Sequence, residues 1–342
     1  NGDAYAIFLG SGNGTLNLRS TDQVQGLIRV QDHNVNLDAV SGGAVFRFED
    51  AAPDSGEFVT NVSDDRFGWF VDDEGGTAPI YASVDVAEIA PSANLVAFYG
   101  DVIGRSADTL SFEPEVQVTR NATGGISGFS SGAFRPYVLI DGESRRFENT
   151  SEIDTDVTVF NGSAGFSGQL ENGLALSLGL GVFKSNGETD SSDFDTEGLY
   201  VDAAIGRQIG AYAVEAGLGY GWLSTDRSRQ IIGSTQAQAD FDSTLLTAHL
   251  GVERTFDVSD AFGLLGFGTV RYTRQKDDAY TETGAIANAS IDEVTTEVVE
   301  ARLGIELDKK LNNGGTVFGE FSGVVRNNLG DTNADVTVFS TT

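Results

Sequence analysis

The sequence predicts an all-β protein, most of which is an antiparallel β-barrel that spans a membrane. Three observations indicate this fold. From Phe134 onward, apolar residues alternate with small or charged ones, as they do in strands with one apolar face. The alternating runs extend over about ten residues or more, which is long for a soluble β-sandwich and suits a tilted membrane strand. The connections between the runs are short and long in turn, which is typical of outer-membrane barrels.

The composition excludes several classes of function. The chain has 342 residues, with 51 acidic and 21 basic side chains and a formal net charge of −30. This acidity excludes a protein that binds nucleic-acid phosphates, since such proteins need a basic surface. There is no cysteine and there are only two histidines, His33 and His249, so thiolate and histidine-rich metal sites are excluded as well. We therefore expect no metal, no cofactor and no nucleic-acid partner.

Residues 1–83 are predicted to form the end of a β-solenoid. Short apolar runs such as Val35–Leu37 and Val45–Phe48 recur along this segment. Glycine-rich turns, Gly10–Gly14 and Ser41–Gly43, separate them. Short strands that recur with turns between them suit stacked coils. A small β-sandwich fits the same pattern nearly as well, so both remain open here.

Residues 84–125 are predicted to be a linker that contains one helix. Pro91 and Ser92 precede a run whose apolar residues recur at helical spacing, and Ser92 is a candidate N-cap. The residues expected on the apolar face of this helix are Leu95, Phe98, Tyr99, Val102 and Ile103.

Residues 126–342 are predicted to form the barrel. Runs such as Leu174–Val182 and Tyr212–Trp222 alternate throughout, and aromatic residues lie near the ends of the apolar rows, where a membrane interface favours them. These aromatic residues are Tyr212, Tyr220, Trp222, Phe262 and Tyr272. The short connections are 171–173, 208–210, 257–260 and 309–315, and the long ones are 142–154, 184–197, 224–240 and 275–293.

The face opposite the apolar rows carries charges of both signs and is predicted to line a polar lumen that contacts the helix. Opposite charges on neighbouring strands are able to pair across such a lumen. The predicted lumen residues are Asp202, Glu215, His249, Glu253, Arg271, Glu300, Arg302, Glu306, Glu320 and Arg326.

Candidate catalytic and metal-binding residues are few. His249 and Glu253 share a face, but no G-x-S-x-G element and no second histidine accompany them, so we predict no enzyme active site. The acidic clusters 72–74, 190–195 and 277–278 offer oxygen ligands without the spacing of an EF-hand loop. We interpret them as solvated surface loops.

The order of these parts resembles the C-terminal region of an autotransporter, the type V secretion family. The segments Gly181–Trp222, Gly268–Arg274 followed by Tyr280–Ala285, and Arg326–Thr332 look like repeats of its barrel. Upstream, Asn36–Asp38 and Val84–Leu110 look like the end of a passenger solenoid and the linking helix.

The resemblance implies an outer-membrane translocator of a Gram-negative bacterium, which exports an N-terminal passenger and displays it at the cell surface. The helix would occupy the pore. The implied partners are outer-membrane lipid, the barrel-assembly machinery, periplasmic chaperones and the chain's own passenger. Some members cleave their passenger within the helix, which makes Asn94 a weak self-cleavage candidate.

The family's barrel has more strands than the nine counted here, and it ends in an aromatic residue. Val336–Phe339 would begin a tenth strand, and the chain stops at Thr342. We therefore expect a barrel that is truncated in this chain.

Two other functions remain open on the sequence. The first is a passive outer-membrane porin or a surface adhesin or structural protein, and the second is a barrel hydrolase. The segment Leu95–Ile103 separates the first from a translocator, because a porin has no need of a lone helix before its first strand.

Overall fold

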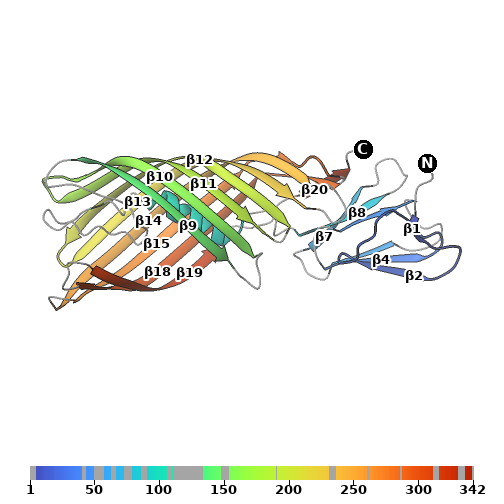
Figure 1. The fold of residues 1–342 in the computed structure, drawn as a ribbon, viewed down its shortest axis with the longest axis horizontal. Helices are drawn as coiled ribbons and strands as arrows, with labels where there is room; N and C mark the ends of the chain where they lie inside the picture. Colours follow the sequence, from blue (N-terminus) through green and yellow to red (C-terminus); the bar gives the residue numbers. More distant parts are fainter. Residues whose placement is uncertain are drawn as a thin grey trace.

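The computed structural model describes residues 5–40, 44–49, 58–62, 67–72, 79–85, 91–105, 110, 134–147, 154–189, 191–230, 236–259, 262–285, 287–310, 316–329 and 336–340. Two bodies stand out in Figure 1, a long curled sheet and a smaller β-rich tail at one of its ends. Within the described residues, no helix has both the length and the apolar character needed to cross a bilayer.

The curled sheet has nine strands, and each is antiparallel to its neighbours. Sequence neighbours pair throughout, except that β15 pairs with β18. This confirms the predicted all-β barrel sheet and its nine strands; within the described residues β9 and β19 are its edges. The strands are β9 (Arg135–Phe147), β10 (Thr155–Gln169), β11 (Leu174–Glu188), β12 (Ser192–Ile209), β13 (Tyr212–Arg229), β14 (Ala237–Ser259), β15 (Phe262–Asp277), β18 (Val294–Lys310) and β19 (Thr316–Asn328).

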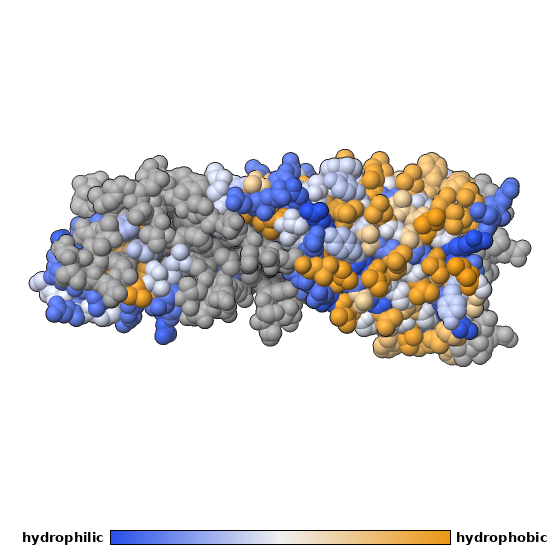
Figure 2. Space-filling model, turned by 180° about the vertical axis from the view of Figure 1, so that it is seen from behind, coloured by the Kyte–Doolittle hydropathy of each residue, from blue (hydrophilic) through white to orange (hydrophobic). Residues whose placement is uncertain are grey.

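The two faces of this sheet differ as the alternation predicts. In β14, Leu250 is 64% exposed on the convex face whereas His249 is 6% exposed on the concave face. On the face seen in Figure 2, apolar side chains are spread widely over the outside of the barrel sheet. Such a surface is far larger than the apolar patches that soluble monomers expose, so it suits contact with lipid.

The connections at one end of the sheet are shorter than the sequence predicts. The expected long loop 184–197 is mostly strand, because β11 runs to Glu188 and β12 starts at Ser192. Likewise β13 continues to Arg229 and β14 begins at Ala237. These strand ends are polar on both faces, so they lack the alternation that marks a strand in the sequence. We call this end of the sheet the loop end and the opposite one, with the connection 170–173, the turn end.

A small sheet stands at the loop end. It contains β16 (Tyr280–Thr281), β17 (Ala287–Ile291) and β20 (Val336–Ser340), with β17 in the middle. The expected start of a tenth barrel strand is therefore wrong in its pairing, because β20 pairs with β17 and not with β19.

The tail contains two sheets whose strands alternate along the chain. In one, β1 (Tyr5–Phe8), β3 (Leu27–Arg29) and β5 (Val45–Phe48) pair in parallel. In the other, β2 (Thr15–Arg19), β4 (Asn34–Ala39) and β6 (Phe58–Val62) do the same. The first sheet continues through β8 (Ile80–Asp85) to β7 (Phe67–Asp72), and these two strands run antiparallel to their neighbours.

The core of the tail lies between its two sheets. It contains residues without solvent exposure, such as Ile28, Val35, Leu37 and Phe46. On the other side of the second sheet, Asn36 Nδ2 donates to Asn17 Oδ1 at 2.8 Å, which joins successive strands. Parallel pairing of alternate strands is what stacked coils produce, but the solenoid and the domain boundaries at 83 and 125 stay predictions.

One helix, α1 (Ala93–Ile103), is found among the described residues. The Ser92 side chain accepts a hydrogen bond from the Leu95 amide at 3.2 Å, so the predicted helix and its N-cap are confirmed. The helix lies against the concave face of the barrel sheet (Figure 1), where it contacts β12, β13, β14, β15 and β18.

Candidate functional site

The candidate site is α1 with the lumen wall that surrounds it. The five predicted apolar residues of the helix are all buried, and they pack with inward-facing residues of five strands. The Tyr99 ring meets Phe183 edge-on, with 4.8 Å between centroids, and its hydroxyl lies 2.8 Å from Ser185 Oγ. The wall residues of this cluster are Val157, Val159, Phe183, Tyr200, Leu223 and Leu245.

Glycine allows the helix to approach the wall closely. A Cβ atom built on Gly100 would overlap the side chain of Thr273 on β15. On β13, two strands away in the sheet, Cβ atoms on Gly219 and Gly221 would each come within 3.0 Å of the Ile103 side chain. Those distances are below any ordinary carbon–carbon contact, so the fit needs glycine on both sides.

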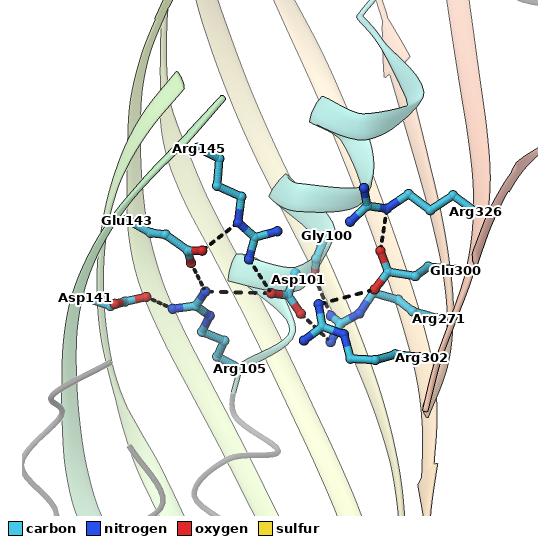
Figure 3. Close-up of polar contacts among 10 residues, drawn as sticks. All are labelled: Gly100, Asp101, Arg105, Asp141, Glu143, Arg145, Arg271, Glu300, Arg302 and Arg326. Atoms are coloured by element: carbon cyan, nitrogen blue, oxygen red, sulfur yellow. Dashed lines mark hydrogen bonds and ion pairs between the residues drawn. The ribbon is translucent and has the colours of Figure 1, made fainter. Parts of the chain in front are cut away.

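An arginine cluster surrounds the last turn of the helix, as Figure 3 shows. Arg271 of β15 donates through Nη1 to the Gly100 carbonyl at 2.7 Å, and its Nη2 lies 3.0 Å from Asp101 Oδ1. Arg105 and Arg145 also lie within 3.8 Å of Asp101. A cation at the C-terminal end of a helix stabilises it, and α1 has no basic residue of its own in that turn.

The first barrel strand completes this cluster with acids. Asp141 and Glu143 of β9 both form ion pairs with Arg105, the second at 2.9 Å. Glu143 also accepts from Arg145 Nε at 2.6 Å, and the Arg145 guanidinium stacks on the Phe98 ring at 4.3 Å. The end of the helix is thus tied to β9 and β15, which lie far apart along the sheet.

A second contact holds the start of the helix. Arg326 of β19 donates through Nη1 to Asn94 Oδ1 at 2.9 Å and through Nε to Glu300 of β18 at 2.6 Å. Arg302 lies 3.6 Å from the other Glu300 oxygen. Asn94 therefore faces a charged wall, and its side-chain oxygen is bound.

The charges around the helix nearly cancel. Five arginines (Arg105, Arg145, Arg271, Arg302 and Arg326) meet four acids (Asp101, Asp141, Glu143 and Glu300). Each of these side chains is at most 26% exposed. Because removing one partner from such a pair leaves a buried charge without compensation, the arrangement fixes the helix against the wall.

The other predicted lumen residues lie on the concave face of their strands, at other positions of the wall. Asp202 is 4% exposed and lies beside Gly179. His249 packs on Gly217 and pairs in register with Arg271. Glu215 lies against Gly251, and Glu253 stands opposite Ala213. Glu306 and Glu320 are a register pair of β18 and β19.

The predicted acidic clusters differ in their exposure to solvent. Asp193 and Asp195 are exposed, but Asp277 is only 3% exposed and accepts from Gln275 Nε2 at 2.9 Å, so it does not belong to a solvated loop. Asp73, Glu74 and Asp190 lie outside the described residues. In the part of the chain that the structure describes, no group of three or more acidic or histidine side chains is arranged to hold a metal ion.

Five residues of the charged network were not among the predicted site residues: Asp101, Arg105, Asp141, Glu143 and Arg145. Glu143 and Arg145 are the last two of these. The last two fall in a segment that the sequence assigns to a loop, but β9 extends to Phe147. Tyr137, Asp141, Glu143 and Arg145 are all odd-numbered and on the inward face. Extending the alternation of inward and outward residues through 142–147 would have placed Glu143 and Arg145 in the lumen.

Comparisons with known proteins concern the family and the fold of the barrel sheet. A family model described as "Autotransporter beta-domain" matches residues 139–342. The translocator domain of autotransporter NalP from Neisseria meningitidis is similar in structure, with a TM-score of 0.52 and 16% identity over 61% of this chain and 74% of that one. The beta domain of the Bordetella autotransporter BrkA aligns with a TM-score of 0.39 and 14% identity over 60% of this chain and 96% of that one.

A search of curated proteins finds no match in sequence. The family model covers more than half of the chain, however, and homologues with this domain are outer-membrane proteins of Gram-negative bacteria. The chain therefore belongs to the autotransporter family, and residues 139–342 are its β-domain.

Proposed function

We propose that this chain is an outer-membrane translocator, which exports an N-terminal passenger and holds the tail at the cell surface. One observation carries the proposal. The chain enters the lumen from the loop end, where Thr296 donates to the Pro91 carbonyl, and β9 begins at the turn end, where Arg135 pairs with Ser167. The described residues thus place the start of α1 at the loop end and the start of β9 at the far end of the sheet, with α1 in the lumen.

The lumen wall suits the passage of an extended chain. Apart from the apolar patch that packs on α1, its inward side chains are mostly small, polar or charged, and polar groups that already form hydrogen bonds with one another offer few strong sites to a passing segment. In the final state α1 occupies this space, so the helix is both the end of the exported segment and the plug of the pore. Export itself needs no metal, no cofactor and no catalytic residue of the chain.

The alternatives fit less well. A passive porin needs an open lumen, whereas α1 packs against five strands of the wall. A hydrolase needs a base beside a nucleophile, and His249 faces Gly217 and Arg271. In the cell, the translocator would depend on the barrel-assembly machinery, on periplasmic chaperones and on outer-membrane lipid as its partners.

Self-cleavage at Asn94 remains a proposal that the family resemblance supports. In this reaction the side-chain nitrogen of Asn94 would attack its own backbone carbonyl carbon and the Asn94–Leu95 peptide bond would break. The Leu95 nitrogen would leave as a free amine, and Asn94 would become a C-terminal succinimide. Arg326 binds the side-chain oxygen of Asn94 and would polarise the amide. Replacement by Asp would abolish release of the passenger if this chemistry occurs, and a passenger released to the same extent from the Asp variant would refute it.

The export function is tested by proteinase shaving of intact cells that express the full-length parent protein with an N-terminal epitope tag. We expect the tag to be lost from intact cells, while a fragment containing residues 134–342 survives and migrates differently on gels before and after heating. A tag that resists the proteinase on intact cells but not in lysates would place the N-terminal region inside and refute the proposal.

A further inference from the structure

The outward face of the barrel sheet carries opposite charges at its two ends. Toward the loop end, Asp195, Asp226 and Asp240 are exposed and lie in register on three neighbouring strands. From the turn end to the middle of the sheet, the outward positions of the described strands hold no acid. The charged residues at these positions, which we call the basic rim, are Arg207, Arg254 and Lys309. In a chain with a net charge of −30, this rim favours an anion.

Arg254 of β14 is held on the outward face by two aromatic rings. Its guanidinium carbon lies 5.2 Å from the centre of the Tyr212 ring and 4.6 Å from that of Phe256. Nη1 donates to the Tyr212 hydroxyl at 3.1 Å, while Nε is covered and has no hydrogen-bond partner among the described residues. No described carboxylate forms an ion pair with Arg254 or Arg207. Both positive charges therefore need an anion from outside the described chain.

A shallow apolar groove lies beside this rim, on the outward face of β10 to β13. The small Ala203 and Ala216 lie in register with the larger Leu218 and Ile205, which leaves a hollow of about 590 Å³. This volume is within the range of about 300–1,000 Å³ that is usual for small-ligand sites. We call the hollow the outer groove, and its larger lining side chains are Phe134, Phe166, Leu176, Leu178, Ile205 and Leu218. Such a lining suits a hydrocarbon chain.

The groove and the two arginines are adjacent. Arg207 follows Ile205 by two residues on the same face of β12, about 7 Å along the strand toward the turn end. It pairs in register with Val214 of β13, and Tyr212 of β13 pairs with Arg254 in the next outward row. Because Arg254 binds the Tyr212 hydroxyl, its guanidinium is directed toward β13. The two guanidiniums thus flank β13, just beyond the end of the groove.

We propose that the outer groove, Arg207 and Arg254 form a binding site for a phospholipid with an anionic headgroup, in the membrane leaflet at the turn end. One acyl chain lies in the groove, and the phosphate lies between the two guanidiniums. Guanidinium binds phosphate through two parallel hydrogen bonds. A zwitterionic lipid would bring an ammonium group to a surface that has cations and no acid, so charge complementarity selects the anionic one. The inference depends on a sheet that spans the membrane and not on export of a passenger.

The test is native mass spectrometry of the full-length protein, purified from outer membranes in detergent and mixed with single lipids. The probes are phosphatidylglycerol and phosphatidylcholine with the same acyl chains. We expect phosphatidylglycerol to bind at least about tenfold more tightly, and Arg207→Gln and Arg254→Gln each to lose most of this preference. Lys309→Gln is the matched control, because it removes the same charge from the same rim on β18, three strands from β13. This control should keep the preference.

A second pair of variants tests the groove without changing a charge. Ala216→Phe fills the hollow, so we expect it to weaken the binding of both lipids several-fold. The control, Ala301→Phe, makes the same change at an exposed outward position of β18, outside the groove. If an arginine variant does not give the heat-dependent gel shift of a folded barrel, the Ala216→Phe result decides.

Three results would overturn the inference. The first is equal affinity of the unaltered protein for the two lipids. The second is an equal loss of preference in Lys309→Gln and the two arginine variants, or equal binding by Ala216→Phe and Ala301→Phe. The third is tighter binding of lipopolysaccharide than of phosphatidylglycerol at the same site, since lipopolysaccharide belongs to the opposite leaflet. An N-terminal tag that stays exposed on cells in every variant would show that export is unaffected by any of these results.

Discussion

At the scale of single residues, Asp101 carries much of the contact between helix and wall. Three arginines from two different strands and the linker surround its carboxylate, within 3.0 to 3.8 Å. Arg271 in turn binds the Gly100 carbonyl at 2.7 Å, at the point where the helix ends. A buried ion pair adds little net stability by itself, but breaking it by removing one partner is costly.

Asp101→Asn is therefore expected to loosen the helix. The change removes the negative charge and leaves the arginines facing one another, at a cost of about 1–3 kcal/mol after allowance for partial exposure to the lumen. In a planar bilayer with purified protein, the open-pore current should then occur about tenfold more often or more. Glu320→Gln is the control, because Glu320 lies exposed outside the network. The same effect in both variants would contradict the role given to Asp101.

Gly100→Ala should act through packing alone. The added methyl group meets the Thr273 side chain, so the helix or β15 must shift, and overpacking of this kind costs about 1–3 kcal/mol. We expect a lower temperature for loss of the folded band on gels. In the control, Gly162→Ala, the new Cβ comes no closer than 3.6 Å to a neighbour. A folded band equally stable in the two variants would refute the close fit.

The sequence predicts the helix side of this site well and the wall side less well. Spacing of apolar residues and the Ser92 cap are local properties, so all five residues of the helix face and its boundaries could be anticipated. The wall residue that contacts Asp101 depends on the register of strands that are distant in sequence. Arg271, which binds the Gly100 carbonyl, is 171 residues away from Gly100 along the chain. An odd or even position along a strand gives the face of the sheet on which a side chain lies, but it does not give the residue that this side chain contacts.

At the scale of the strand, the environment changes along its length. In the middle of β14, Leu250 faces outward and is 64% exposed while Thr247 and His249 face inward and are buried. Toward the loop end the outward residues become polar, as at Gln238, Asp240 and Asp242. Alternation reveals a strand only where its two faces meet different surroundings, so the polar extensions could not be recognised from the sequence.

The lipid-facing role of β14 leads to a paired prediction. Leu250→Arg places a charge in the apolar band, which costs about 2–4 kcal/mol near the middle of a bilayer. Glu253→Arg makes a comparable change on the lumen face of the same strand. We expect the first to reduce the amount of heat-modifiable barrel in outer membranes several-fold and the second to leave it nearly unchanged. Equal tolerance of both would argue against a membrane-spanning sheet.

At the scale of the whole molecule, the two ends of the barrel sheet differ in what they carry. The turn end has tight connections such as 170–173, and the loop end carries the tail and the small sheet of β16, β17 and β20 (Figure 1). The fold class and the number of barrel strands could be predicted, because both follow from periodicity. The contact between the tail and the barrel could not be predicted from the sequence. It is made by the buried cluster of Ala82, Ala237 and Ala285, and no sequence pattern links these three residues.

This polarity predicts the orientation of the protein in the membrane. Single cysteines introduced as Glu171→Cys and Thr283→Cys mark the turn end and the loop end at exposed positions. A maleimide that cannot cross membranes should label the second on intact cells, and the first only after the outer membrane is permeabilised. Labelling of Glu171→Cys alone on intact cells would reverse the orientation and place the tail in the periplasm.

The length of β14 sets how far the tail stands from the lipid. Its 23 residues correspond to about 75 Å of extended strand, or roughly 55 Å of height at the usual tilt, against an apolar band about 25 Å tall. The excess at the loop end forms a collar of paired strands between the apolar band and the tail. The height of the tail above the lipid is therefore a property of strand length, and residues removed in register from neighbouring strands would lower it stepwise.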